Sequence, residues 1–428
     1  MADVRPFRGL RYNAQRVALS DVVCPPYDVI SPDEARRYRT RSHYNAILLD
    51  MPAANDESPG QDRYSHAAAE FVRWQSEGVL MRDESPSLYL LEQQFRGPDG
   101  VPRTRRGFIG RLRLEEPASR VVIPHEHTNP GPRRDRLDLL RATRANLSQV
   151  FLLYPDDEHL VWRTVEQAAG PAVSVHDADG TLHSLRSASG PQAEKAAASL
   201  ADRSLIIADG HHRYASALAY REERRAAGDH SADWCMAYFC GMDDPGLTIF
   251  AAHRLLKGID VPPLDEVRRR LAGSFTIVAD IPDALDDPPA MMSRLTGNQT
   301  YPHFAVVLPA ERRTLIVRLR DNAPVERLVA GGLAPAVASL PVTVLHHVLL
   351  REVFHVEPGA SEGLIDYYPR PDDAFASLRA GDHKLGVFLS ASTVDEVNRV
   401  AAAGEFMPQK ATYFFPKLLT GLVFDLLD

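Results

Sequence analysis

The segment Leu205–Tyr214, with the sequence LIIADGHHRY, joins a short apolar run to residues that can bind an anion. The β-branched run is too short for a helix, so it predicts a buried strand that ends at Asp209-Gly210. We expect a helix to start at His211, and a helix N-terminus has unpaired N–H groups and a positive dipole end. Gly210 allows a tight turn with no Cβ in the way of a ligand. The pattern therefore predicts an anion-binding turn.

The helix is expected to carry His211, His212 and Arg213 in its first turn, where all three can donate hydrogen bonds to phosphate oxygens. Cations at this end oppose the helix dipole, and an anionic ligand removes that conflict. Two alternatives remain open: Asp209 as a helix N-cap above surface histidines, and a zinc site. Adjacent histidines point about 100° apart on a helix, so they do not chelate one ion as an i,i+4 pair does.

A second segment, Val121–Thr128 (VVIPHEHT), reads as a short strand that stops at Pro124 and is followed by His125 and Glu126. A carboxylate in that place can accept a proton from a substrate hydroxyl. A solvated loop acid is the alternative interpretation. The spacing is not that of HExxH, which excludes the metalloprotease motif.

A third segment, Gly404–Pro416, offers Lys410 and Thr412 as a cation and a hydroxyl for a substrate. We expect these two residues in a loop that leads into a final helix, with the following aromatic residues in the core. The segment Pro25-Pro26-Tyr27-Asp28 is a rigid, extended entry to a turn, and it allows either a ligand contact or a buried turn.

The elements that must position these residues alternate between helix and strand, which predicts a mixed α/β fold. Apolar periodicity and turn signals define the expected elements. Helices are expected from Ser31, at 63–77, 134–146, 191–201, 211–227, 342–354 and 393–404; strands at 149–154, 204–208, 234–240 and 386–390; and hairpins at 87–114, 173–185 and 303–319.

Length and composition set the outer limits. The chain has 428 residues, 44% of them apolar and 25% charged, with a net charge of −8 that argues against a nucleic-acid surface. Its three cysteines form no metal or disulfide pattern. The polar N-terminus predicts no signal peptide, and no apolar run reaches about 18 residues. We therefore expect a cytoplasmic protein with no membrane partner.

The three segments, in their order, resemble those of the free L-serine kinases of the ParB/sulfiredoxin-like superfamily. The matching pieces are Pro124-His125-Glu126, Ala208–Arg213 and Gly404–Thr412, and Ile365-Asp366-Tyr367 resembles a further segment of the archaeal enzymes. The resemblance implies that the DGHHR segment binds the phosphates of ATP or ADP. It also implies a glutamate base toward the serine hydroxyl and a C-terminal segment that encloses the amino acid.

A closer resemblance, over nearly the whole chain, is to a large bacterial family of unknown function. Its marks stand here at Arg5–Tyr12, Pro25–Ser31, Pro124–Thr128 and Ile207–Tyr214. The serine-kinase resemblance covers the motifs alone. This chain is longer than the archaeal kinases, mainly at its N-terminus and between residues 230 and 360, so the substrate is less defined than the nucleotide site.

The resemblance and the residues together predict a phosphotransferase that moves phosphate between ATP or ADP and the hydroxyl of a free amino acid, with L-serine the first candidate. Mg²⁺ is the expected cofactor, and the reaction can run in either direction. The predicted roles are catalysis by Glu126 and Asp209; phosphate binding by Gly210, His211, His212 and Arg213; substrate binding by His125, Lys410 and Thr412; and a Mg²⁺ contact by Asp209.

Alternatives from other classes stay open. These are a kinase of another hydroxyl metabolite such as threonine or homoserine, a non-catalytic ParB-like nucleotide-binding switch, and an inactive interaction protein. No GxxxxGK[ST] or GxGxxG is present, and no cysteine lies in the phosphate turn, which counts against a P-loop, a Rossmann site and a sulfiredoxin. Expected partners are a nucleotide and a small amino acid; the oligomeric state stays open.

The expected domain division has three parts. Residues 1–120 form an N-terminal α+β region, residues 121–260 a ParB/sulfiredoxin-like nucleotide-binding core, and residues 261–428 a C-terminal α/β region that completes the substrate cleft. The three motif segments fall near residues 125, 210 and 410. Function therefore requires distant parts of the chain to converge.

Overall fold

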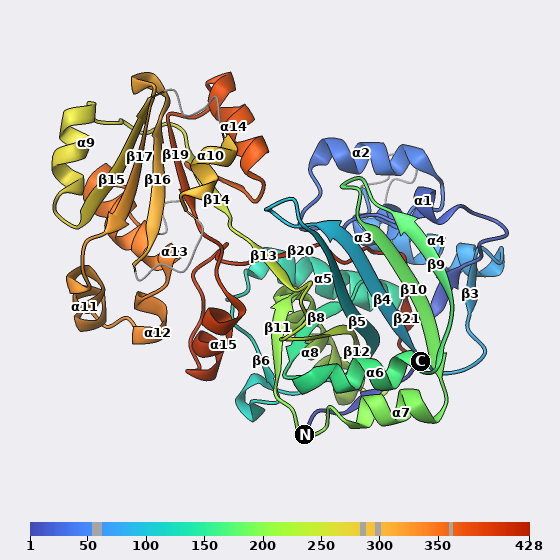
Figure 1. The fold of residues 1–428 in the computed structure, drawn as a ribbon. Helices are drawn as coiled ribbons and strands as arrows, with labels where there is room; N and C mark the ends of the chain where they lie inside the picture. Colours follow the sequence, from blue (N-terminus) through green and yellow to red (C-terminus); the bar gives the residue numbers. More distant parts are fainter. Residues whose placement is uncertain (54–61, 283–287, 296–300, 359–362) are drawn as a thin grey trace. The chain divides into compact units, whose positions relative to one another are not determined.

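The computed structural model describes residues 1–53, 62–282, 288–295, 301–358 and 363–428. It confirms the mixed α/β class, with helices packed on two main sheets (Figure 1). The chain forms two compact units: a first unit of Met1–Thr248 with Pro416–Asp428, and a second unit of Ile249–Phe415. The three-part division at residues 120 and 260 stays a prediction. No helix in the described residues is long and apolar enough to cross a membrane.

The first unit is built on a nine-stranded mixed sheet in the order β6-β11-β8-β12-β5-β4-β10-β9, with β1 paired to β5. The expected hairpins β4–β5 and β9–β10 are both present and antiparallel. The bounds are β1 Val4–Arg5, β4 Ser87–Arg96, β5 Pro102–Arg113, β6 Val122–Ile123, β8 Val150–Tyr154, β9 Ala169–His176, β10 Leu182–Ser189, β11 Leu205–Asp209 and β12 Trp234–Gly241.

One face of this sheet packs against α6 (Leu160–Glu166), α7 (Pro191–Ala198) and α8 (His211–Ala226). The contact is apolar, because alternate strand residues such as Leu90 and Phe108 point to this face and meet helix residues of the same buried cluster. Burial of such a cluster is the main stabilising contribution to the unit.

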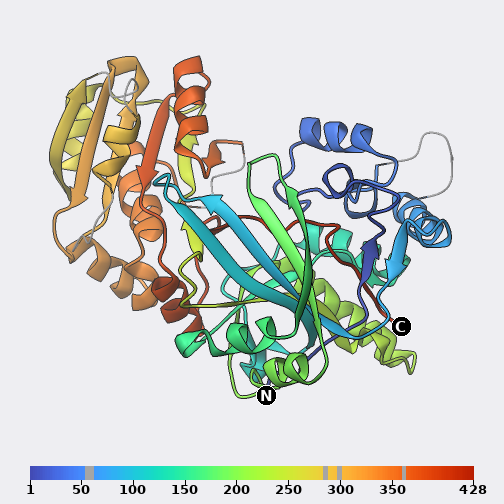
Figure 2. The same cartoon turned by 45° about the vertical axis from the view of Figure 1, so that its right-hand side comes forward.

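The opposite face carries the C-terminal segment of the chain. Figure 2 shows this segment, in dark red, crossing the first unit to the C-terminus. Arg105 of β5 donates to the carbonyl of Pro416 at 2.5 Å, and Arg111 contacts Asp425 at 2.7 Å. Residues 416–428 therefore belong to the first unit although 167 residues of the second unit precede them in the chain.

Smaller elements complete the first unit. The expected helix from Ser31 is α2, and Ser31 forms a capping box with Glu34. The expected helix at 63–77 is α4, which buries Ala67, Phe71 and Trp74. The bounds are α1 Leu19–Val22, α2 Pro32–Arg41, α3 Ile47–Asp50, α4 Arg63–Ser76, α5 Pro130–Thr143, β2 Leu10–Tyr12, β3 Leu80–Arg82, β7 Ala145–Asn146 and β21 Asp425–Leu426.

The second unit has a six-stranded sheet in the order β15-β17-β16-β19-β14-β18. Its strands are β14 His253–Leu256, β15 Phe275–Pro282, β16 His303–Leu308, β17 Arg313–Leu319, β18 Ile365–Tyr368 and β19 Leu385–Leu389; β20 is Tyr413–Phe415, and β13 (Thr248–Phe250) begins at the boundary between the units. Its helices are α9 Leu264–Leu271, α10 Pro288–Ser293, α11 Ala323–Ala330, α12 Pro335–Ala338, α13 Pro341–Val344, a π-helix at Leu345–Val353, α14 Pro371–Ala380 and α15 Val394–Ala402.

The final helix expected after Thr412 is wrong. Residues Tyr413–Phe415 form strand β20, and the chain beyond it is extended. Pro416 has no N–H for a helix, and Gly421 has φ +101°, which no helix accommodates. Backbone hydrogen bonds to the N-terminal region take the place of helical ones, such as that from Thr420 N to Cys24 O at 2.9 Å.

Candidate functional site

The first two motif segments meet because their strands are neighbours. β6 lies parallel to β11, with Val122 opposite Leu205 and Ile123 opposite Ile206. The carboxyl ends of parallel strands lie at the same edge of a sheet, where ligands of open α/β sheets commonly bind. The residues that follow β6 and the turn that follows β11 are therefore side by side in the first unit.

Three side chains connect the two segments. The backbone N–H of His125 donates to Nε2 of His211 at 3.2 Å, and the two rings meet edge to face at 4.6 Å. Nδ1 of His211 lies 4.0 Å from Oε2 of Glu126. The side chain of Glu126 is 31% exposed and that of His211 is 5% exposed. The carboxylate is thus open to a ligand on one side and faces an imidazole on the other.

The contacts of His211 fix its tautomer. A backbone N–H can only donate, so Nε2 must be unprotonated and the ring proton of the neutral form is on Nδ1, toward Glu126. Burial lowers the pKa of His211 well below its ordinary value, and the neighbouring His125 adds to this effect. His211 is therefore a neutral imidazole whose Nδ1–H faces Glu126, and not a cation.

His125 and His212 are also held within the fold. His125 has no accessible surface, and burial lowers the pKa of its side chain to about 4, although a hydrogen bond to the backbone of Ile207 opposes the shift. Nε2 of His212 accepts from the N–H of Asn129, at the start of α5, at 2.9 Å. The contacts of His125 with Ile207 and of His212 with Asn129 join the two motif segments. The roles of the two histidines toward substrate and phosphate stay predictions.

The turn between β11 and α8 depends on Gly210. Gly210 is the N-cap of α8, with φ +91°, and no side chain caps the helix start. The alternative in which Asp209 is the N-cap is therefore wrong. A Cβ at position 210 would lie 2.9 Å from Nε of Arg213. The helix N-terminus is thus presented by a residue without a side chain, as close approach of an anion to the backbone requires.

Asp209 lies between two cations. Its Oδ2 accepts from Nζ of Lys417 at 2.9 Å, and its Oδ1 lies 3.5 Å from Nη2 of Arg213. Burial by itself would raise the pKa of this carboxyl group, but Lys417 and Arg213 outweigh it and hold the pKa far below the ordinary range. Asp209 is therefore ionised and oriented.

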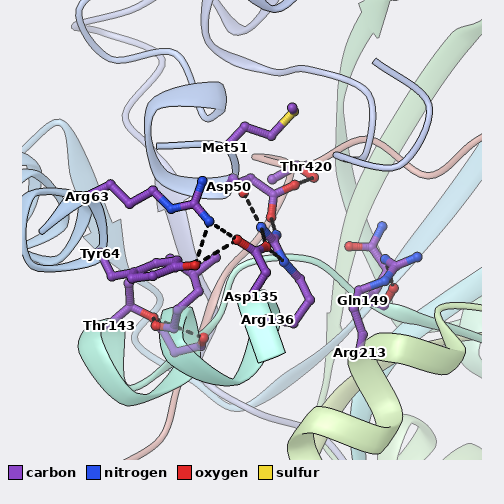
Figure 3. A network of polar contacts seen from close by, with 12 residues as sticks. Asp50, Met51, Arg63, Tyr64, Asp135, Arg136, Thr143, Gln149, Arg213 and Thr420 are labelled. Carbon is purple, nitrogen blue, oxygen red and sulfur yellow. Dashed lines mark hydrogen bonds and ion pairs between the residues drawn. The ribbon is translucent and has the colours of Figure 1, made fainter. Parts of the chain in front are cut away.

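Arg213 points into the first unit rather than outward. Its Nη1 donates to the carbonyl of Gln149 (Figure 3), and its side chain is 8% exposed. Asp28, from the PPYD segment, adds a second carboxyl group. Burial and the charge of Asp209 raise the pKa of Asp28, while Arg213 and Lys417 oppose the rise. Tyr27 packs under the guanidinium of Arg136 at 4.0 Å.

A buried polar network fixes the backbone that carries Lys417. Nε2 of Gln93 donates to the carbonyl of Lys417 at 3.1 Å, and Arg105 holds both Gln93 and Pro416. Gln93 also lies 3.2 Å from Nδ1 of His183. All three of the network side chains, Gln93, Arg105 and His183, are fully buried. Lys417 is therefore aimed at Asp209 by contacts from the middle of the sheet.

Lys410 and Thr412 belong to the second unit and are described within it. The carbonyl of Lys410 accepts from Nη2 of Arg254 at 3.2 Å, and Lys410 has φ +55°. Thr412 is half-buried beside β20. Their roles toward a substrate stay predictions.

Two charged residues of these clusters, Lys417 and Arg254, were not singled out from the sequence. Lys417 stands alone in the apolar run FFPKLL, and Arg254 stands in the strand sequence HRLL. A single charge in an otherwise apolar run is a usable signal, because burial of an unpaired charge is costly. Asp28 lies in the PPYD segment, whose ligand contact was left open, and its partners cannot be recognised without the fold.

A metal site cannot be assigned from protein ligands alone. Among the described residues, no group of three or more His, Cys, Asp or Glu side chains could hold an ion. The zinc alternative therefore finds no ligand set in that part of the chain. A Mg²⁺ ion commonly takes one or two carboxylates together with substrate phosphates, a smaller requirement.

Comparisons with known proteins give a family. Residues 4–343 match the family described as "Protein of unknown function (DUF1015)", so the chain belongs to that family. The match confirms the family resemblance inferred from the motifs. None of the curated proteins matches the chain.

Solved structures give three further similarities. A mutant of free serine kinase in complex with AMP is 14% identical over 72% of this chain and 88% of that chain, with a TM-score of 0.34. A conserved hypothetical protein from Pyrococcus furiosus is 15% identical over 69% and 87%, with a TM-score of 0.30. SbnI with a C-terminal truncation, from Staphylococcus aureus, is 9% identical over 73% and 85%, with a TM-score of 0.33.

Proposed function

We propose that the protein is a nucleotide-dependent phosphotransferase that moves phosphate between ATP or ADP and the hydroxyl of a free amino acid, with L-serine the first candidate. The observation that carries the proposal is the meeting of the two motif segments at the ends of β6 and β11. This arrangement brings Glu126 next to the start of α8, whose N-terminus suits phosphate oxygens. Phosphoryl transfer needs mainly such positioning and charge neutralisation.

The proposed roles follow from the contacts. Glu126 takes the proton of the substrate hydroxyl, and Nδ1 of His211 faces its carboxylate at 4.0 Å. The backbone of Gly210 and the start of α8 hold the phosphates. His212 and Arg213 lie in the same first turn of α8 and support it through their contacts with Asn129 and Gln149. His125, Lys410 and Thr412 remain the proposed substrate contacts.

Asp209 and Asp28 have the carboxylate oxygens that Mg²⁺ prefers. The donor chemistry at this edge therefore fits Mg²⁺ bound together with nucleotide phosphates. When bound, the ion would neutralise phosphate charge. Lys417 keeps Asp209 ionised in its absence, because the ion pair at 2.9 Å favours the charged form.

Phosphorus NMR tests the proposal directly. The full chain is incubated with Mg²⁺, ATP or ADP, and L-serine, L-threonine or L-homoserine. Transfer to one of these hydroxyls supports the proposal and identifies the substrate. Nucleotide binding without any transfer contradicts it and favours a non-catalytic nucleotide switch.

Replacement of Glu126 tests the base. Glu126→Gln should lower kcat by about 10²–10⁴ and leave nucleotide affinity unchanged, because the amide cannot accept the proton. Glu326→Gln is the matched control, since Glu326 is an exposed residue of α11 in the second unit. A Glu126→Gln enzyme with normal kcat would remove Glu126 from the mechanism.

A further inference from the structure

Arg254 in the second unit is a buried cation whose partners among the described residues are all uncharged. Its side chain is on β14 and is 1% exposed. Nη1 donates to the carbonyl of Ala252, Nη2 donates to the carbonyl of Lys410 at 3.2 Å, and Nε has no partner among the described residues. No described Asp or Glu forms an ion pair with it, although an unpaired buried charge is costly.

The groups around Arg254 do not supply a negative charge. The ring of Tyr367 lies 5.2 Å from its guanidinium carbon. Burial, together with the charge of Arg254, lowers the pKa of His253 and of His346 to about 3, so each is neutral at pH 7. Burial lowers the pKa of Arg254 itself to about 10, which still leaves it charged at that pH.

Arg105 is a useful comparison, because among the described residues it also forms no ion pair and its Nη1 has no partner. Arg105 is also fully buried, but its guanidinium holds the side-chain oxygen of Gln93 and lies near enough to Asp244 to lower that residue's pKa in opposition to burial. Arg254 has no such counter-charge in the described part of the second unit. A guanidinium with a planar set of donors is suited to a carboxylate or a phosphate.

The backbone next to Arg254 has further unusual features. Lys410, whose carbonyl Arg254 holds, has φ +55°, a conformation that costs a non-glycine residue free energy and is concentrated at ligand sites. His346 lies in a π-helix, Leu345–Val353, and π-helical turns are frequent at functional sites. Lys410 also brings a second cation, on an exposed side chain, to the same loop.

We propose that Arg254 anchors an oxyanion-binding site in the second unit, which takes the carboxylate or phosphate group of a small metabolite. Its guanidinium binds the oxyanion and the Lys410 loop adjusts around it. The assignment of the oxyanion as the carboxylate of the amino-acid substrate rests on the function proposed above. The oxyanion site itself does not depend on that function.

Isothermal titration of the full chain tests the site with four probes: inorganic phosphate, L-serine, O-phospho-L-serine and L-serinamide, which lacks the carboxylate. ADP is kept at saturation so that it occupies the first unit. Binding of L-serine but not of L-serinamide assigns a carboxylate, and binding of phosphate alone assigns a phosphate group. A wild-type chain that binds no oxyanion overturns the proposal.

Arg254→Met then tests the anchor. We expect at least a tenfold loss of affinity for the oxyanion, with little loss of thermal stability, since an apolar side chain of similar length removes the unpaired charge. Arg254→Lys should keep part of the affinity. The matched control is Arg313→Met, a half-buried second-unit arginine paired with Asp280, which should bind as wild type. Unchanged affinity in Arg254→Met, with or without a lower melting temperature, overturns the proposal.

The outcomes separate this proposal from the phosphotransferase. Arg254-dependent oxyanion binding without phosphate transfer keeps the site and removes the proposed function. Phosphate transfer together with an unchanged affinity of Arg254→Met for every oxyanion probe keeps the function and removes the site.

Discussion

Arg213 in the first unit and Arg254 in the second are both buried guanidinium groups, but they differ in what neutralises them. Arg213 lies 3.5 Å from the Asp209 carboxylate, which Lys417 also holds, and it feels the charge of Asp28. Arg254 has carbonyl oxygens and an aromatic ring. The charge of Arg213 is thus compensated within the fold, whereas that of Arg254 is left for a ligand.

This difference changes which groups we expect to bind an anion in each unit. Since Arg213 is committed to Asp209 and to the carbonyl of Gln149, phosphate in the first unit must rely mainly on the backbone at Gly210 and the start of α8. The second unit has a strong donor group with no carboxylate of its own. The four predictions below test whether burial and pairing explain what each arginine contributes.

The largest effect is expected where a buried pair is broken. Arg136 donates to Asp50 at 2.8 Å in the network of Figure 3, with side chains 6% and 1% exposed. Arg136→Met leaves the buried Asp50 without its cationic partner, so the free energy of unfolding should fall by about 3–5 kcal/mol. All three tryptophans (Trp74, Trp162 and Trp234) lie in the first unit, so their fluorescence during urea unfolding reports this unit.

The control on the same helix is Arg134→Met, because the Arg134 side chain is 85% exposed. It should change the free energy of unfolding by less than about 0.5 kcal/mol. An Arg136→Met loss as small as that of the control would contradict the argument, since a paired buried arginine would then contribute no more than an exposed one.

The next effect concerns the packing of Arg213 against the turn. Gly210→Ala places a methyl group 2.9 Å from Nε of Arg213 in a backbone with φ +91°. Backbone strain of about 1–2 kcal/mol and overpacking of about 1–3 kcal/mol should together lower the free energy of unfolding by about 2–5 kcal/mol. Nucleotide affinity should fall as well. Tryptophan fluorescence and a nucleotide titration measure the two effects.

Gly180→Ala separates strain from contact. Gly180 is in the β9–β10 turn with φ +80°, and a Cβ there meets nothing within 4 Å. The free energy of unfolding of Gly180→Ala should fall only by the cost of backbone strain, about 1–2 kcal/mol. If the free energy of unfolding falls equally in Gly210→Ala and Gly180→Ala, the added methyl group at position 210 does not clash, because Arg213 moves away from it. The contrast between Arg213 and Arg254 is then weaker than the structure indicates.

The sequence could predict what depends on neighbours along the chain. Strand β11, the turn at Gly210 and helix α8 follow from an apolar run, a glycine and helical spacing, and the predicted hairpins follow from turn residues. The meeting of Glu126 with His211 also follows from motif order once β6 and β11 are known to be parallel neighbours. The histidine protonation state does not, because it depends on burial and on the N–H of His125.

Contacts between segments that are far apart in the chain could not be predicted from the sequence. Lys417 and Asp209 are 208 positions apart, and only the return of the C-terminal segment to the first sheet brings them together. The wrong final helix shows the same limit: its residues are apolar enough for a helix, but Gly421 and the backbone bonds to the N-terminal region select an extended chain. The local sequence pattern favours a helix in this segment, whereas the tertiary hydrogen bonds favour an extended chain.

The third prediction concerns Lys417 and gives a pH dependence. Lys417→Met removes the partner of a partly buried carboxylate, so the free energy of unfolding at pH 7 should fall by about 1.5–3 kcal/mol. Asp209 has a folded-state pKa below its unfolded value, so its contribution is present above about pH 4 and is lost as the pH falls toward the folded pKa. The gap between variant and wild type should therefore narrow below about pH 4.

Urea unfolding from pH 3 to pH 7, followed by tryptophan fluorescence, measures this gap. Lys195→Met on α7 is the matched control, because Lys195 is exposed and should show no such dependence. A gap that stays constant across the range would mean that Lys417 stabilises the unit through its packing and not through the charge of Asp209.

The smallest effect is expected at an exposed pair of good geometry. Arg141 on α5 and Glu223 on α8 lie 2.5 Å apart with side chains 45% and 41% exposed. Water screens this pair, so Arg141→Gln should cost less than about 1 kcal/mol, and 1 M salt should remove most of that difference. Urea unfolding at low and high salt measures it. The distance is shorter than that between Arg213 and Asp209, so a loss above 2 kcal/mol would show that geometry, and not burial, decides what an arginine contributes. The contrast between Arg213 and Arg254 would then need a different cause from the compensation of a buried charge.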